Sequence, residues 1–264
     1  MKAAAQNAMV RERVDVNDEH VILRCSLDAG PLVFAPGQFA VIGLSDDAPR
    51  FDAESAPSDG EPHPLIRRAY SIASAPHEPE LELFVSLVVE GALTPRLFAL
   101  RPGDRLFVAP KAAGHLTLDG ISTTAPIVLL ATGTGIAPFV SMLRAEAHER
   151  TRRQFIVVHS VRFERDLAYD AELTRLDARG VCRYVPVVTR GTSAWGGARV
   201  RIPELVASGE LERRTGVRLD PAATHVFLCG NPGMVDAVRG LLVSRGYLAP
   251  RGGVRTTLHF ESYA

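Results

Sequence analysis

The sequence contains few cysteines, no excess of charge of either sign and no long apolar run. Its three cysteines, Cys25, Cys182 and Cys229, lie too far apart along the chain to form a Cys-x-x-Cys unit. This spacing argues against an iron–sulfur cluster or a structural zinc ion held by the chain, and we predict no metal site.

The balanced charge and the lack of long apolar runs each argue against one class of binding partner. The 30 basic residues are balanced by 30 acidic ones, which argues against a general nucleic-acid-binding protein. The longest apolar runs, such as "PIVLLA" at 126–131, are far shorter than the roughly 18 residues that cross a membrane. The first residues hold too short an apolar stretch for a signal peptide. We therefore expect a cytoplasmic protein that binds neither nucleic acid nor membrane.

Length and charge distribution favour two domains. A chain of 264 residues exceeds the usual size of one domain. Residues 1–110 carry 10 Lys and Arg against 16 Asp and Glu, a net charge of −6, and the remainder carries 20 against 14, a net charge of +6. A basic second half suits a small polyanionic ligand, although scattered surface arginines are the commoner cause of such an excess. We place the domains at 1–122 and 123–264.

The first half has the pattern of short strands separated by turns, which is typical of an antiparallel barrel. The expected strands are 20–27, 39–44, 69–74, 81–89 and 104–110. The segment 45–64, rich in Asp, Pro and Ser, is expected to be an exposed loop insertion. A brief helix is predicted over 95–100, with Thr94 as its N-cap and Pro95 at its first position.

The second half alternates apolar runs with amphipathic segments, as in a parallel sheet covered by helices on both faces. The expected strands are 127–132, 155–161, 182–189 and 225–230, and the expected helices are 137–149, 167–179, 203–208 and 232–245. Such sheets bind ligands at the carboxyl ends of their strands. The predicted fold class is thus an antiparallel β-barrel followed by an α/β parallel-sheet domain.

Two glycine motifs each follow an expected strand and begin an expected helix. In "GTGIAPF" at 133–139, two glycines let the backbone approach a phosphate, and the start of a helix adds positive charge. The motif is not the Gly-x-Gly-x-x-Gly fingerprint, and alone it is often only a tight turn. The second motif is "FLCGNPGMV" at 227–235, which places Cys229 beside the first. Taken alone, Cys229 is better explained as a small buried hydrophobe.

Arginines follow several of these strands. Arg162 ends "VHSVR", Thr189 and Arg190 end the next strand, and Arg199 and Arg201 come after a short loop. Each alone is explained by a surface charge. Together they favour a phosphate clamp, because guanidinium groups bind phosphate through paired hydrogen bonds.

The stretch "RRAYS" at 67–71 places a guanidinium, a phenol and a hydroxyl on one strand. Arg68 and Tyr70 are two apart and share a face in an extended chain, whereas Ser71 faces the other way. A solvated strand face with a tyrosine over the core is one interpretation. The functional interpretation is that this strand binds a planar ligand that carries phosphate.

The order of these motifs resembles the bacterial ferredoxin (flavodoxin)–NADP reductases, from about Val10 to the last residues. The resemblance is carried by "RAYS", "GALTPRL", "AAGHLTL", "LLATGTGIAPF", "VHSVR", "VVTR", "RIPELVASGELE", "THVFLCGNPGMV" and "ESYA". It implies a barrel that binds FAD and a parallel-sheet domain that binds NADP(H). It also implies hydride exchange with NADP(H), single-electron exchange with ferredoxin or flavodoxin, and a monomer.

The resemblance implies residue roles as well. Arg68 is expected at the FAD pyrophosphate, Tyr70 against the isoalloxazine and Ser71 near flavin N5. The implied FAD set is Arg68, Ala69, Tyr70, Ser71, Thr94, Ala113, Gly114 and Tyr263. The implied NADP set is Thr132, Gly133, Thr134, Gly135, Arg162, Thr189, Arg190, Arg201, Gly230, Asn231 and Met234. The implied catalytic residues are Ser71, Cys229 and Glu261, with a solvated charge as the alternative for Glu261.

Three features depart from the family or leave its pattern open. The segment 45–64 is longer than we expect for these reductases. Many members end in an aromatic residue that stacks on FAD, and Tyr263 is the candidate here. Either Arg199 or Arg201 matches the phosphate ligand, and the following "IPELVASGELE" favours Arg201.

Other functions stay open on the sequence alone. An NADH-dependent flavin reductase of the cytochrome b5 reductase type shares the flavin and glycine motifs, but it has less use for Arg190 and Arg201. An electron-transfer flavoprotein subunit would carry a cysteine-bound cluster, which the cysteine count disfavours. A flavoprotein domain that only binds or regulates would hold FAD without reducing ferricyanide with NADPH.

Overall fold

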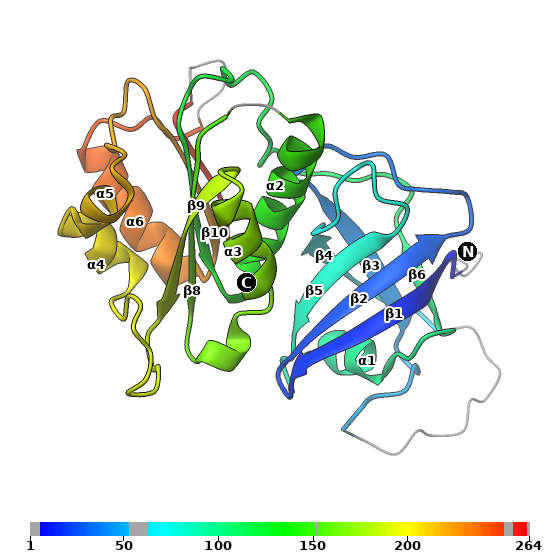
Figure 1. Ribbon diagram of the computed structural model, residues 1–264. Coiled ribbons are helices and arrows are strands. Elements are labelled where there is room, and N and C mark those ends of the chain that lie inside the picture. The colour runs from blue at the N-terminus through cyan, green and yellow to red at the C-terminus, as the bar shows by residue number, and fades with distance from the viewer. Residues whose placement is uncertain (1–5, 53–62, 151–152, 251–255, 263–264) are drawn as a thin grey trace. The chain divides into compact units, whose positions relative to one another are not determined.

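The computed structural model describes residues 6–52, 63–150, 153–250 and 256–262 (Figure 1). The chain folds as two compact units, Met1–Thr117 and Leu118–Ala264, and each has its own apolar core. Within the described ranges, none of the helices combines the length and the apolarity that crossing a membrane requires. The domain boundary at 122/123 stays a prediction.

The first unit is an antiparallel barrel of six strands. Their order across the sheet is β4-β3-β6-β1-β2-β5, and a bridge between Ile72 and Leu83 joins the two outer strands. This bridge closes the sheet on itself, which pairs the outer edges. The strands are β1 (Ala8–Asn17), β2 (His20–Leu27), β3 (Phe39–Ser45), β4 (Leu65–Ser71), β5 (Leu81–Ser86) and β6 (Arg105–Val108).

The bounds of β4 differ from the predicted strand 69–74. The strand begins earlier, at Leu65, because it pairs with β3 along its whole length, from Leu65 opposite Ser45 to Ser71 opposite Phe39. Beyond Ser71 the chain changes partner, and the Ala73 N–H donates to the Glu82 carbonyl of β5 at 2.9 Å.

One short helix, α1 (Thr94–Ala99), packs its apolar side into the barrel core through Leu97 and Phe98. The prediction of Thr94 as its N-cap is wrong, because the helix begins at Thr94 and that side chain caps no helical N–H. The Thr94 hydroxyl instead accepts from the Val88 N–H at 3.0 Å and donates to the Val88 carbonyl at 2.9 Å. The side chain therefore ties the helix to the chain that follows β5.

The second unit is a parallel sheet of five strands in the order β11-β10-β7-β8-β9. The strands are β7 (Ile127–Thr132), β8 (Phe155–Val161), β9 (Cys182–Val188), β10 (His225–Gly230) and β11 (Leu258–Ser262). The chain moves outward from β7 to β9 and then returns to β10 and β11 on the other side of β7. The strand order thus reverses between β7 and β10, and sheets of this kind bind ligands at such a reversal.

Helices cover both faces of this sheet (Figure 1). On one face lie α2 (Ala137–Glu149) and α3 (Asp170–Ala178), and on the other α4 (Ile202–Ala207), α5 (Glu210–Thr215) and α6 (Pro232–Ser244). Every residue of β8 and β10 is buried, as expected for strands covered on both sides. The predicted helix 167–179 begins too early, because residues 167–169 form the turn that links the 3₁₀ helix Glu164–Asp166 to α3.

Candidate functional site

The residues predicted to bind flavin near the start of β3 lie on two segments that flank it. Ser71 of β4 is opposite Phe39, the first residue of β3. On the other side, Ala113 exchanges two backbone hydrogen bonds with Phe39, each 2.9 Å long. Gly114 follows with φ 108°, and its carbonyl accepts from Gln38 Nε2 at 3.2 Å. The structure thus brings the end of "RRAYS" and the Ala-Gly turn to the same place.

Arg68 and Tyr70 share a face of β4, as predicted. They lie opposite Ile42 and Ala40, which are fully buried in the barrel core. Tyr70 packs against this core, and its burial raises the pKa of the phenol while the charge of Arg68 lowers it. The tyrosine is therefore a neutral plate beside a fixed positive charge.

The two adjacent arginines of β4 are used differently. Arg67 places its guanidinium over the Phe107 ring, 4.7 Å from the centroid, a cation–π contact that secures it. Arg68 is exposed and donates to the Arg67 carbonyl at 2.7 Å. In the part of the chain that the structure describes, no carboxylate pairs with Arg68, so its charge is available to an anion.

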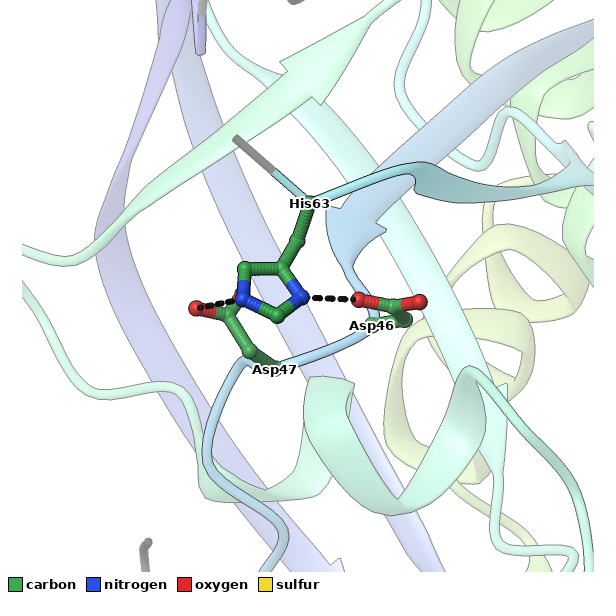
Figure 2. A group of neighbouring side chains, drawn as sticks. All are labelled: Asp46, Asp47 and His63. Carbon is green, nitrogen blue, oxygen red and sulfur yellow. Dashed lines mark hydrogen bonds and ion pairs between the residues drawn. The ribbon is translucent and has the colours of Figure 1, made fainter. Parts of the chain in front are cut away.

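Three side chains join the two ends of the long segment between β3 and β4 (Figure 2). Asp46 and Asp47 come at the end of β3, and His63 comes shortly before β4. His63 Nδ1 lies 3.0 Å from Asp46 Oδ1, and its Nε2 lies 3.8 Å from Asp47 Oδ2. One ligand atom from each residue falls within 4.8 Å of the others, yet each ring nitrogen faces a different carboxylate. These polar contacts hold together the two ends of the predicted loop, whose residues 53–62 lie outside the described ranges.

The two glycine motifs interlock at the reversal point between β7 and β10. A Cβ atom on Gly135 would overlap the backbone of Cys229, and a Cβ atom on Gly230 would overlap Thr132. A side chain at Gly135 would therefore collide with the second motif, and a side chain at Gly230 would collide with the residue before the first motif. The sequence pattern predicts that these glycines bind a phosphate, whereas the structure shows that Gly135 and Gly230 are required by packing. Gly133 differs, because no atom lies within 4 Å of its Cβ position and it is its positive φ of 52° that favours glycine.

The start of α6 lies beside this interlock. Thr132 Oγ1 accepts from the backbone N–H of Asn231 at 2.8 Å. The Asn231 side chain caps the helix by accepting from the N–H groups of Gly233 and Met234, at 2.9 and 3.3 Å. A capped helix of 13 residues carries a partial positive charge at this end. The end of β7 and the start of α6 thus form one polar corner.

Two of the arginines after β8 and β9 are exposed cations. Arg190 and Arg201 are exposed, and within the described residues neither side chain has a hydrogen-bond or ion-pair partner. The Arg190 N–H donates to the Arg162 carbonyl at 2.8 Å, which puts the ends of β8 and β9 side by side. Thr189 is tied in as well, because its hydroxyl donates to the Val161 carbonyl at 3.2 Å.

Arg199 is already engaged with its own loop. Its guanidinium donates to the carbonyl oxygens of Gly191, Thr192 and Trp195, at 2.9, 2.6 and 2.8 Å. A guanidinium that serves three carbonyls has few donors left for an anion. Of the two candidates that the sequence leaves, Arg201 is the one whose guanidinium is available.

Cys229 and Glu261 lie side by side on β10 and β11. They are register partners, so their side chains share one face of the sheet. Cys229 is fully buried. Glu261 is partly buried, and this burial raises the pKa of its carboxyl to about 7, so the group exchanges a proton near neutral pH. Tyr263, the predicted flavin-stacking residue, lies outside the described residues.

The same face of β11 carries His259. Its ring stacks on Phe227, with centroids 4.2 Å apart, and its Nε2 lies 3.1 Å from His225 Nδ1. Burial and the neighbouring His225 lower the pKa of His259 to about 4. A carboxyl that resists ionisation and an imidazole that resists protonation thus stand two residues apart.

Comparisons with known proteins agree with this arrangement. A family model described as an oxidoreductase NAD-binding domain matches residues 129–240. The chain is 37% identical to the flavodoxin/ferredoxin–NADP reductase of Escherichia coli (strain K12) over 212 residues, which is 80% of this chain and 79% of that protein. It is 35% identical to the ferredoxin–NADP reductase of Pseudomonas aeruginosa, over 84% of this chain and 83% of that one. The chain belongs to the ferredoxin/flavodoxin–NADP reductase family.

A solved reductase of this family has the same fold throughout. The crystal structure of a ferredoxin NADP+ reductase from Neisseria gonorrhoeae, with bound FAD and NADP, is 27% identical in sequence. It superposes with a TM-score of 0.83 and covers 98% of this chain and 99% of its own. The predicted fold class, a barrel followed by a parallel-sheet domain, is therefore confirmed.

Several of the residues predicted to bind NADP(H) lie close together in the second unit. The second unit gathers Thr132, Gly133, Gly135, Gly230 and Asn231 at the β7–β10 reversal, with Thr134 in the 3₁₀ turn between β7 and α2. Met234 is buried in the core under α6. Sequence reasoning missed Trp195, which organises the loop before Arg199. A signal was present, because Trp195 is the only tryptophan and lies in the glycine-rich "GTSAWGGAR".

Proposed function

We propose that this protein is an FAD-dependent oxidoreductase that exchanges hydride with NADP(H) and single electrons with ferredoxin or flavodoxin. The observation that carries the proposal is the pair Arg190 and Arg201, two exposed cations without a partner in the described chain. The chain that carries them belongs to a family, and the two relatives described above are both named as NADP reductases. An enzyme that used only NADH would have no comparable use for them.

The barrel has groups that fit FAD. Arg68 offers an available guanidinium for a pyrophosphate, and Tyr70 offers a neutral ring for the isoalloxazine. Ser71 is the candidate group near flavin N5. We assign the rest of the cofactor surface to Ala69, Thr94, Ala113 and Gly114. For Thr94 the proposed contact is through the start of α1, because its hydroxyl is engaged with Val88.

The parallel sheet has groups that fit NADP(H). Gly133 leaves open space at the end of β7, and the capped start of α6 favours negative charge. We propose that these two features hold the pyrophosphate. Arg190 and Arg201 would then hold the 2′-phosphate, with Arg162 and Thr189 beside them, through charge-assisted hydrogen bonds.

The bound flavin supplies the chemistry that converts one hydride into two single electrons. The chain contributes orientation, the exclusion of water and a place for the proton. Glu261 is our candidate for moving that proton, because its pKa of about 7 lets it both accept and release one near neutral pH. Cys229 is buried beside it, and we propose that it shapes the surface on which the nicotinamide rests. The cytoplasmic location, the monomeric state and the identity of the carrier protein remain predictions.

Flavin analysis and a coenzyme comparison test the proposal. The purified yellow protein should release FAD on heating, and it should reduce ferricyanide with NADPH at a much higher kcat/KM than with NADH. Reduced ferredoxin or flavodoxin should form when it replaces ferricyanide. Release of FMN alone would overturn the cofactor assignment. Equal use of both coenzymes would favour an NADH reductase of the cytochrome b5 reductase type.

A further inference from the structure

The loop between β9 and α4 is built around the only tryptophan of the chain. Trp195 Nε1 donates to the Ala198 carbonyl at 3.1 Å. A Cβ atom on Gly191 would lie 3.0 Å from the Trp195 side chain, and one on Gly197 would lie 2.6 Å from its ring. The indole thus lies against two glycine backbones, and the loop is wrapped closely around it.

The Arg199 side chain closes this loop through hydrogen bonds to its backbone. Arg199 is the last residue of the loop, and its three hydrogen bonds, to the carbonyls of Gly191, Thr192 and Trp195, join the end of the loop to its beginning and middle. They also occupy carbonyl oxygens whose partial negative charge would otherwise repel a nearby anion.

The loop is anchored at two further points, one on the 3₁₀ helix that follows β8 and one on the end of β9. Thr192 donates to Glu164 Oε1 from its N–H at 3.1 Å and from its hydroxyl at 2.9 Å. The Val188 N–H donates to the Ala198 carbonyl at 3.0 Å, so the loop runs back alongside the end of β9. Arg190 lies immediately before this anchored loop, and Arg201 lies two residues after Arg199, as the N-cap residue of α4.

We propose that the loop formed by residues 191–199 is a specificity-determining element, in which Trp195, Gly197 and Arg199 are positioning residues for Arg190 and Arg201. The inference rests on the proposed function, since it concerns the 2′-phosphate of NADP(H). Two exposed arginines bind a phosphate through several donors only when their backbones are held at a fixed separation. The tryptophan core and the Arg199 clasp fix that separation.

The neighbouring glycines provide a matched pair of variants. Gly197→Ala places a methyl group against the indole, whereas Gly196→Ala meets no atom within 4 Å. Neither glycine has a positive φ, so the backbone itself accepts alanine at both positions. The two variants differ by one residue and only one of them displaces Trp195.

The test measures kcat/KM for NADPH and NADH and the emission of Trp195 in the full-length, FAD-loaded enzyme. For Gly197→Ala we expect the NADPH to NADH ratio of kcat/KM to fall by about tenfold, the equivalent of one lost charge-assisted hydrogen bond. Its tryptophan emission should shift, and its affinity for adenosine 2′,5′-bisphosphate should fall in parallel. Gly196→Ala should match the wild type in all three measurements. Trp195→Phe, which loses the bond to Ala198, should reproduce the Gly197→Ala ratio if the latter variant folds poorly.

The reference variant Arg201→Ala distinguishes an error in the proposed coenzyme from an error in the proposed role of the loop. If the wild type shows no preference for NADPH, the proposed coenzyme is wrong. If the wild type prefers NADPH and Arg201→Ala loses that preference, but Gly197→Ala and Trp195→Phe keep it, the proposed function stands and the positioning role of the loop is overturned.

Discussion

Arginines of similar exposure in this protein differ in what their guanidinium groups already bind. Arg67 lies over an aromatic ring, Arg199 serves three carbonyls, and Arg68, Arg190 and Arg201 retain donors for a ligand. Exposure alone does not distinguish these cases. The partner of each guanidinium does, because a donor in use inside the protein is lost to an anion.

The available arginines lead to a prediction for coenzyme binding. Arg190→Ala and Arg201→Ala should each raise the KM for NADPH by about tenfold for every 1.4 kcal/mol of binding lost. The KM for NADH should change little, because NADH lacks the 2′-phosphate. Steady-state kinetics with ferricyanide measures both. Arg162→Ala should have a smaller effect in the same direction, and an equal rise for both coenzymes would contradict the assignment.

At the scale of elements, the close approach of β10 to the end of β7 and to the turn after it depends on two glycines, which have no side chains of their own. Gly135 stands against the backbone of Cys229, and Gly230 stands against Thr132. Backbone atoms cannot move aside as the end of a flexible side chain can. The interlock is therefore sensitive to a single added methyl group.

Gly135→Ala should destabilise the second unit by about 1–3 kcal/mol or more, as overpacking of a tight contact does. Gly240→Ala is the control. It lies within α6 with nothing near its Cβ position, and alanine there should stabilise the helix by about 0.5–1 kcal/mol. Melting temperatures should move in opposite directions. A rise for both variants would show that the β7–β10 contact can relax.

The stability of β11 should depend on pH in two opposite ways. The folded state raises the pKa of Glu261 from 4.5 to about 7, so it binds a proton that the unfolded chain has released. The contribution of Glu261 is therefore fully present below about pH 4.5 and is lost as the pH rises through about 7. The folded state lowers the pKa of His259 from 6.5 to about 4, so its contribution is present above pH 6.5 and is lost as the pH falls.

Denaturation followed by Trp195 emission reports on the unit that contains β11. Relative to the wild type, Glu261→Gln should gain stability as the pH rises from 4.5 through about 7, and His259→Asn should gain it as the pH falls from 6.5 toward 4. Identical pH profiles for the wild type and Glu261→Gln would mean that the carboxyl is ionised in the folded protein, which would also remove it as a proton carrier.

The sequence predicts elements well where apolar runs end at turn residues. β7, β8, β10 and α2 have the predicted bounds, since each is buried along most of its length. β1 is missed because only its first residues are buried and a bulge near Arg11 breaks its alternation. α5 is missed because Leu211 is its only buried residue. The choice between Arg199 and Arg201 needs the fold of the loop, which depends on contacts between residues distant in sequence.

At the scale of the whole molecule, charge is divided between the halves of the chain. Residues 111–264 carry a net charge of +6, and Arg190 and Arg201 lie in this part. A field of this kind attracts polyanions over distances that salt controls.

The KM for NADPH should rise with ionic strength more steeply than the KM for NADH. Between about 0.01 M and 0.1 M salt, the screening length falls from about 30 Å to about 10 Å, which weakens the attraction of the 2′-phosphate most. Kinetics in a salt series measures both slopes, and an uncharged osmolyte at equal osmolality is the control. Equal slopes would indicate that only the pyrophosphate is held electrostatically.

The interlocked glycines also bear on how such proteins diverge. Gly135 and Gly230 must stay small for β7 and β10 to lie together, whatever ligand is bound. A descendant that lost its coenzyme would remain under selection to keep both residues, while Arg190 and Arg201 would drift freely. In such a descendant the glycines would therefore persist as a requirement of the fold, and only the arginines would show whether NADP(H) is still bound.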